Sequence, residues 1–151
     1  GEFIKLNPKQ IEGIDNNSAT VLACRRQGLR VNHVNALKLP FKDQSFAGVH
    51  CSHVIEHLLP KDAYTLLKEL ARVLKLNGLL VIQTPILWSG FYDNLTHIKP
   101  YSSSAIMRYL CQTAPDTTFP RLSVRFKQIA LTSRYRNFTK TGYILVLKRE
   151  K

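Results

Sequence analysis

The chain has little of several features that mark other classes of protein. Its 151 residues contain only three cysteines, Cys24, Cys51 and Cys111, an odd number without metal-ligand spacing. Reduced thiols in a cytoplasmic protein are therefore expected. The longest apolar runs, such as residues 78–82, have the length of a strand and are far too short to span a bilayer. We expect no signal peptide, no membrane partner and no internal repeat, and the length fits a single domain over residues 1–151.

Acidic residues are also scarce. The chain has 10 Asp and Glu against 22 Lys and Arg, which gives a formal net charge of +12. Residues 97–151 contribute +9 of this charge and residues 1–96 only +3. Such a basic segment indicates either an anionic partner (nucleic acid, a phosphorylated sugar or a membrane surface) or a solvated face that keeps the protein soluble. Composition alone leaves both interpretations open.

Strand and helix patterns alternate along the chain. Strands are expected over residues 11–15, 29–34, 46–53 and 79–83, and helices over residues 17–27, 62–76 and 102–111. The second helix has a clear apolar stripe, and Asn77 and Gly78 are expected to end it because both tolerate positive φ. Two further strand-like runs, residues 121–131 and 143–148, are joined by a polar segment over residues 132–142. This order predicts an α/β sandwich around a mainly parallel sheet.

Asp15 ends the first expected strand and stands before the helix-starting residues Asn16 and Asn17. A carboxylate at the C-terminal tip of a parallel strand can accept hydrogen bonds from both hydroxyls of a ribose. A carboxylate just before a helix can equally serve as its N-cap. The residues that follow at regular spacing decide between these roles.

That series consists of Leu39-Pro40-Phe41, Ser45-Phe46, Val54-Ile55-Glu56-His57, Arg72 to Gly78, and Val81 to Pro85. In this order it resembles the class I S-adenosylmethionine-dependent methyltransferases of the small bacterial kind labelled type 11. The resemblance covers the chain up to about Tyr101, and beyond it only the order of elements matches. It implies a Rossmann-like α/β sandwich that closes with a C-terminal antiparallel strand pair, and S-adenosylmethionine as the cofactor.

The resemblance also implies roles for residues after the first two strands. Asp15 would bind the ribose hydroxyls, and Asn16 would lie against one face of the adenine. Asn35 stands where the family usually has Asp, and its amide oxygen could still accept a hydrogen bond from the adenine amino group. Ala36 would add a backbone contact and Leu37 an apolar face for the ring.

Two further cofactor contacts are implied near the third strand, where Ser52 and His53 would pass beneath the methionine part of the cofactor. Gly1 resembles the last glycine of the family's G-x-G-x-G loop, so the first strand and two loop glycines would be missing from the N-terminus. A cloning remnant over residues 1–3 is the alternative. A sheet without its first strand would have an open edge that allows a homodimer.

A segment from Asp93 to Tyr101 resembles an Asp-x-Thr-His-x-Arg/Lys-Pro-Tyr motif of the same subgroup. His97 in this segment is the candidate catalytic residue, because a histidine there could orient or deprotonate the methyl acceptor. The alternative is that His97 only pins its loop through backbone hydrogen bonds. His57 is expected to be structural, and no metal site is expected.

The resulting expectation is methyl transfer to an unidentified acceptor, either a small molecule or a sugar. Three alternatives stay open. One is a basic RNA-binding or RNA-modifying protein, and another is an enzyme that binds a nicotinamide nucleotide through Asp15. The third is a non-catalytic fragment of the methyltransferase fold.

Overall fold

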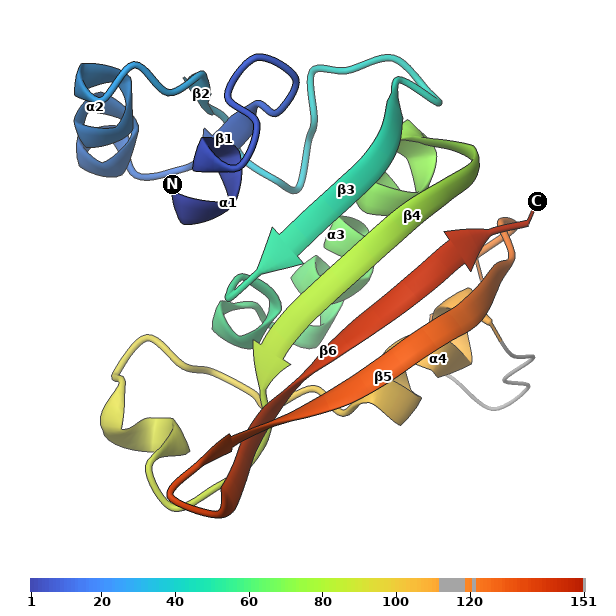
Figure 1. Ribbon diagram of the computed structural model, residues 1–151. Helices are drawn as coiled ribbons and strands as arrows, with labels where there is room; N and C mark the ends of the chain where they lie inside the picture. Colours follow the sequence, from blue (N-terminus) through green and yellow to red (C-terminus); the bar gives the residue numbers. More distant parts are fainter. Residues whose placement is uncertain (112–118, 121, 151) are drawn as a thin grey trace. The chain divides into compact units, whose positions relative to one another are not determined.

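The computed structural model describes residues 1–111, 119–120 and 122–150. The chain forms two compact units, Gly1–Pro40 and Phe41–Lys151, and each is described by itself (Figure 1). None of the described helices has the length and apolar character that crossing a membrane requires. The expectation of a single domain stays a prediction.

The first unit is a small parallel βαβ element. It contains α1 (Glu2–Lys5), β1 (Gly13–Asp15), α2 (Ser18–Arg26) and β2 (Val31–His33). β1 pairs in parallel with β2, and Asp15 lies opposite His33. Asn17 is the N-cap of α2, and Gly28 follows the helix with a φ of +74°, which a residue without Cβ adopts freely.

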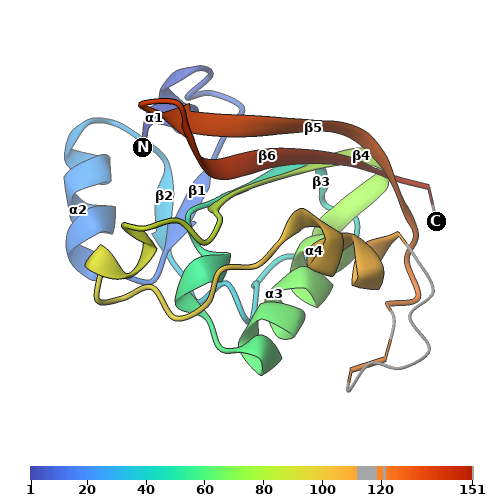
Figure 2. The ribbon, with the colours of Figure 1, turned by 90° about the horizontal axis from the view of Figure 1, so that it is seen from below.

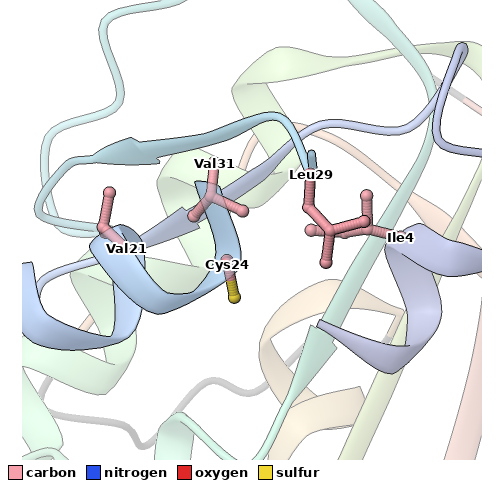
Figure 3. Close-up of a cluster of buried hydrophobic side chains, with 5 residues drawn as sticks. All are labelled: Ile4, Val21, Cys24, Leu29 and Val31. Atoms are coloured by element: carbon pink, nitrogen blue, oxygen red, sulfur yellow. The ribbon is translucent and has the colours of Figure 1, made fainter. Parts of the chain in front are cut away.

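An apolar cluster holds the first unit together. Four of its five buried side chains come from the two helices and from β2, and the fifth, Leu29, precedes β2. Figure 3 shows how they lie. They are Ile4, Val21, Cys24, Leu29 and Val31. This cluster fixes α2 against the two strands, so the strand tips keep a defined position within the unit.

The second unit is a four-stranded mixed sheet with the order β3-β4-β6-β5. Its strands are β3 (Phe46–Ser52), β4 (Leu74–Pro85), β5 (Phe126–Arg136) and β6 (Thr139–Arg149). β3 and β4 are parallel, whereas β6 runs antiparallel to both of its neighbours. α3 (Pro60–Val73) and α4 (Ser103–Leu110) cover the same face of the sheet (Figures 1 and 2). Two short 3-10 turns, Ile55–His57 and Phe91–Asp93, follow β3 and β4.

The predicted apolar stripe of α3 is confirmed. Ala63, Leu66, Leu67, Leu70 and Val73 are all buried, at the i, i+3, i+4 spacing of one helix face. They face the sheet residues Leu80, Ile82, Leu145 and Leu147, which are almost fully buried as well. The core of the second unit therefore lies between its sheet and its two helices.

The predicted end of this helix is wrong. α3 ends at Val73, and Leu74 already belongs to β4, where it pairs with Phe46. The pairing then shifts to Gly48 opposite Leu79, so residues 75–78 form an irregularity within the strand. Asn77 does have positive φ, +63°, but it uses this conformation in a strand bulge rather than in a helix cap.

The polar segment over residues 132–142 is not the connection that was expected. Most of it is strand, and β5 and β6 are joined by a turn in which only Asn137 and Phe138 lie between the paired residues Arg136 and Thr139. Both turn residues have positive φ, +47° and +64°. Such a turn matches the right-handed twist of a hairpin, so the two strands stay paired up to their ends. The antiparallel pair itself is confirmed, and residue 121, where its first strand was expected to begin, lies outside the described residues.

Candidate functional site

Asp15 lies at the C-terminal tip of β1, as predicted. Its carboxylate Oδ1 accepts a hydrogen bond of 2.8 Å from the backbone N–H of Asn17. The helix cap is Asn17 itself, whose side chain accepts from the N–H groups of Ala19 and Thr20. Asp15 therefore shapes the turn before the helix without capping it. Within the described part of the chain Oδ2 of Asp15 has no hydrogen-bond partner, so it could accept from a ligand.

Asn16 is exposed directly after this strand tip. Its carbonyl lies 2.9 Å from Nε2 of His33 at the end of β2. Because a carbonyl can only accept, His33 carries its proton on Nε2 in this contact. The loops after the two parallel strands are thus tied together within the first unit.

The loop after β2 begins with a tight turn at Asn35. Its side-chain oxygen accepts from the N–H of Leu37 at 2.9 Å, and its carbonyl accepts from Lys38 at 3.0 Å. Ala36 and Leu37 are half-buried. The turn fixes the position of the Asn35 amide, and the oxygen keeps a second lone pair for a ligand donor. Contact with adenine stays a prediction for all three residues.

Gly1 has a packing reason to lack a side chain. A Cβ at this position would lie 2.8 Å from Cδ1 of Leu29 and 3.3 Å from Sγ of Cys24. The carbonyl of Gly1 accepts from the N–H groups of Ile4 and Lys5 and begins α1. A cofactor contact at Gly1 stays a prediction.

In the second unit, Ser52 ends β3 and His53 follows it with a φ of +54°. Nδ1 of His53 lies 3.1 Å from Oε1 of Glu56, and Nε2 lies 2.9 Å from the side-chain nitrogen of Gln83 and 3.3 Å from Nη1 of Arg134. The two groups around Nε2 are donors, so Nε2 accepts and Nδ1 carries the proton that it donates to Glu56. The lone pair of Nε2 is thereby engaged.

Glu56 is fully buried, and sequence reasoning did not find its environment. The hydroxyl of Thr84 donates to Oε2 of Glu56 at 3.0 Å. The backbone carbonyl of Glu56 accepts from the N–H groups of Ile98 and Lys99. Burial raises the pKa of the carboxyl, but hydrogen bonds from His53, from its own backbone and from Thr84 outweigh this effect and hold the pKa below its ordinary value. Glu56 therefore anchors the segment that carries His97 to the end of β3.

Within the part of the chain that the structure describes, His97 is held by one of its ring nitrogens. Its Nδ1 donates to the carbonyl of Phe91 at 2.7 Å, and its ring packs against the rings of Phe91 and His57 with centroids 4.6 and 5.0 Å away. Because Nδ1 carries the proton, Nε2 has a free lone pair that can accept one. The structure thus shows the hydrogen bond that pins the loop, and the same bond orients Nε2. Catalysis by His97 stays a prediction.

Glu56, His57 and His97 form the group that could hold a metal ion among the described residues. One donor atom of each lies within 4.8 Å of the others. His57 donates its Nδ1 proton to the carbonyl of Thr96 at 2.9 Å, so each histidine could offer its Nε2. The carboxylate of Glu56 already accepts from Thr84 and His53 without a metal. These contacts explain the cluster as a structural brace.

A cavity of about 400 Å³ in the second unit adjoins His53 and His97. Six side chains determine its chemistry: His53, Trp88, His97, Arg134, Tyr135 and Arg136. The sequence analysis linked the basic segment of residues 97–151, which contains both arginines, to an anionic partner such as nucleic acid. It did not place them near His53, because 81 positions separate Arg134 from it. The basic C-terminal segment was the signal that could have found them.

Another cavity of the unit, of about 470 Å³, lies elsewhere. Its walls include Asp43, Glu69 and Arg72, and Arg72 donates to both carboxylates at 2.8 Å. These contacts pair both carboxylates of the cavity with Arg72. The cavity near His97 therefore offers the more reactive set of side chains, although it is smaller.

The chain matches a family model described as a methyltransferase domain over residues 2–82. This match covers more than half of the chain, including both β1 and β3. The chain therefore belongs to this methyltransferase family, as its resemblance to the class I S-adenosylmethionine-dependent enzymes predicted. No curated protein matches the chain.

Solved structures share the fold. A SAM-dependent methyltransferase from Archaeoglobus fulgidus has 21% identity and a TM-score of 0.68, with 97% of this chain and 79% of that chain covered. One from Methanosarcina mazei has 17% identity and a TM-score of 0.71, with 97% and 85% covered. The N-methyltransferase NodS from Bradyrhizobium japonicum, solved with S-adenosylhomocysteine, has 13% identity and a TM-score of 0.72, with 99% and 72% covered. The predicted α/β methyltransferase fold with its antiparallel C-terminal pair is thus confirmed.

Proposed function

We propose that this chain binds S-adenosylmethionine through the loops after β1 and β2 and transfers its methyl group to a small-molecule acceptor, with His97 on the acceptor side. The family match carries the first part of this proposal, because it spans the strand tips at Asp15 and Asn35. The match ends at residue 82, so it does not extend to His97.

Asp15 and Asn35 fit a nucleoside. Asp15 presents a carboxylate oxygen at a parallel strand tip, where ligands of open α/β sheets bind, and its other oxygen is fixed by Asn17. Asn35 presents an amide held in a turn. Two hydroxyls of a ribose are matched donors for the first group, and the adenine amino group is a matched donor for the second.

On the acceptor side the chain has to position a nucleophile and receive its proton. S-adenosylmethionine supplies a methyl group that a sulfonium already activates, so no strong catalyst is needed for the donor. His97 suits the proton transfer better than His53, because Nε2 of His53 already accepts from Gln83 and Arg134. Nε2 of His97 has no hydrogen-bond partner among the described residues, and the Phe91 carbonyl stabilises the Nδ1 proton as charge develops.

Thermal unfolding in the presence of nucleotides tests the donor assignment. A ligand that binds only the folded state at a concentration of 100 times its Kd stabilises it by about 2.7 kcal/mol. We expect S-adenosylhomocysteine to raise the Tm and NAD to leave it unchanged. A rise with NAD alone would instead support the nicotinamide alternative.

A second candidate, RNA binding, has support from the hairpin turn. Arg134, Tyr135, Arg136, Phe138 and Lys140 are all exposed there. Interleaved cations and aromatic rings suit a nucleic-acid strand. RNA binding that weakens steeply with salt would favour this function.

A reducing compartment such as the cytoplasm fits the cysteines. All three are free thiols, and Cys24 and Cys51 are buried. Burial raises the pKa of Cys51 to about 12, so this thiol, one residue before the end of β3, stays protonated at neutral pH. Stability that does not change on addition of a reductant would agree with this location.

A further inference from the structure

The cavity beside His97 has an unbalanced charge. Two permanent cations, Arg134 and Arg136, line it, whereas none of its lining residues that the structure describes is Asp or Glu. The two arginines form no salt bridge within the described residues. Guanidinium groups that line a concave surface without a carboxylate partner are suited to a phosphate or a carboxylate from outside the chain.

The local backbone explains how three consecutive residues reach the same cavity. Neighbouring residues of a regular strand point to opposite faces. The β5–β6 register shifts between Arg134 and Tyr135, where Arg134 lies opposite Gly142 and Tyr135 opposite Lys140. The extra residue of this bulge, Thr141, lies on β6. The bulge increases the local twist of the hairpin, and Arg134, Tyr135 and Arg136 all line the cavity at this point.

Arg134 is also positioned by the site already described. Its Nη1 lies 3.3 Å from Nε2 of His53, which in turn is held by Glu56 and Gln83. A guanidinium has five N–H donors, and this contact uses one. The remaining donors can bind an anion without any loss of the contact to His53.

Flat side chains complete the cavity. Trp88 and Tyr135 both line it, and 65% of Tyr135 is exposed. An indole and a phenol ring offer stacking surfaces to a sugar or an aromatic ring. The volume of about 400 Å³ lies in the range of small-molecule sites.

We propose that the methyl acceptor is a small anionic molecule that carries a phosphate or carboxylate for Arg134 and Arg136 and a ring for Trp88 and Tyr135. This proposal rests on the proposed methyl transfer. The acceptor's hydroxyl oxygen or amine nitrogen forms a bond to the methyl carbon as the carbon–sulfur bond breaks. The electron pair of that bond stays on sulfur, and the acceptor's proton goes to Nε2 of His97.

The chain contains its own reporter for this site. Trp88 is the single tryptophan of the sequence, so its fluorescence reports on the cavity alone. Glucose 6-phosphate and 4-hydroxybenzoate serve as the phosphate and carboxylate probes, and glucose and phenol as their neutral counterparts. We expect a saturable change of Trp88 emission with at least one anionic probe, at a Kd at least tenfold below that of its neutral counterpart.

Substitution assigns the binding to the two arginines. Arg134→Gln and Arg136→Gln should each weaken the anionic probe about tenfold, which corresponds to about 1.4 kcal/mol. Lys127→Gln is the matched control, because Lys127 is an exposed cation of the same strand that does not line the cavity, and it should change the Kd less than twofold. Circular dichroism and Tm show whether each variant is folded.

Several outcomes would overturn the inference: equal binding of charged and neutral probes, no saturable change with either anion, or equal losses in all three variants. A short RNA bound in preference to both anions would also overturn it, in favour of a nucleic-acid surface. Calorimetry with S-adenosylhomocysteine on the same samples separates the two proposals. If it binds normally while the anion preference is absent, only the acceptor inference fails; if it does not bind, the proposed function fails.

Discussion

The two carboxylate oxygens of Asp15 have different surroundings, which makes its two roles separable. Oδ1 accepts from Asn17, whereas Oδ2 has no hydrogen-bond partner within the described residues. Asp15→Ala removes both, and Asp15→Asn keeps an oxygen for Asn17 while it removes the charge. Loss of the turn hydrogen bond should lower the free energy of unfolding by about 0.5–1.5 kcal/mol in the alanine variant. The asparagine variant keeps this bond and should lose little stability.

For the cofactor, Asp15→Ala should weaken S-adenosylhomocysteine binding by about 1.5–3 kcal/mol, since paired charge-assisted hydrogen bonds to the ribose are lost. Calorimetric titration measures this change directly. Glu12→Ala is the matched control, because it removes an exposed carboxylate just before the same strand and should leave the affinity unchanged. Unchanged affinity in the Asp15 variants would show that Asp15 only shapes the turn.

His97→Gln tests the acceptor side. The amide cannot take a proton, so turnover with an accepted substrate should fall by about 10²–10⁴-fold, whereas the affinity for S-adenosylhomocysteine should stay within about twofold. Steady-state rates and calorimetry on the same sample separate the two effects. Parallel losses of Tm and turnover would show that the hydrogen bond to Phe91 is the whole role of His97.

Glu56 gives the protein a specific response to acid. Its pKa in the folded state lies below the ordinary 4.5, so the carboxylate contributes stability above that pH, and this contribution is lost as pH falls through the folded-state value. Glu56→Gln should cost about 1–3 kcal/mol near neutral pH, because the buried contacts to His53 and Thr84 weaken. Unfolding by urea at several pH values should show the deficit shrink below pH 4.5. A deficit that stays constant with pH would mean that the charge of Glu56 contributes nothing.

At the scale of elements, the local pattern of apolar residues predicted the middle of a helix better than its end. The apolar stripe of α3 was readable because burial of one face imposes a helical period. Its end was not, because Leu74 leaves the helix to pair with Phe46 of β3, a partner far away in the sequence. The polar residues of the hairpin were read as a linker for a similar reason, since pairing with β6 rather than composition makes β5 a strand.

The hairpin turn offers a prediction about backbone strain. Phe138 has a φ of +64° and is fully exposed, so its side chain contributes no packing while its Cβ disfavours this conformation. Phe138→Gly should therefore raise the stability by about 1 kcal/mol. Phe138→Ala is the control, since alanine keeps the Cβ and should bring little gain. Loss of stability in the glycine variant, measured by thermal unfolding, would contradict this description of the turn.

At the scale of the whole molecule, the sequence predicted the residues proposed for the methyl donor but not the cavity proposed for the acceptor. Asp15 ends β1 and Asn35 lies in the loop just after β2, so their positions depend only on local order. The cavity depends on contacts between distant segments: Arg134 reaches His53 through the hairpin register, and the His97 segment is held by the Glu56 carbonyl. Side-chain chemistry at such a site follows from the fold and cannot be read from spacing.

Calorimetric titration of this chain with S-adenosylhomocysteine and, separately, with NAD tests the central claim most directly. The carboxylate at the tip of β1 and the amide of Asn35 are matched to an adenosine, and the family match covers both. The account predicts saturable binding of S-adenosylhomocysteine with one site per chain and no saturable heat with NAD. Saturable binding of NAD together with no binding of S-adenosylhomocysteine would contradict it.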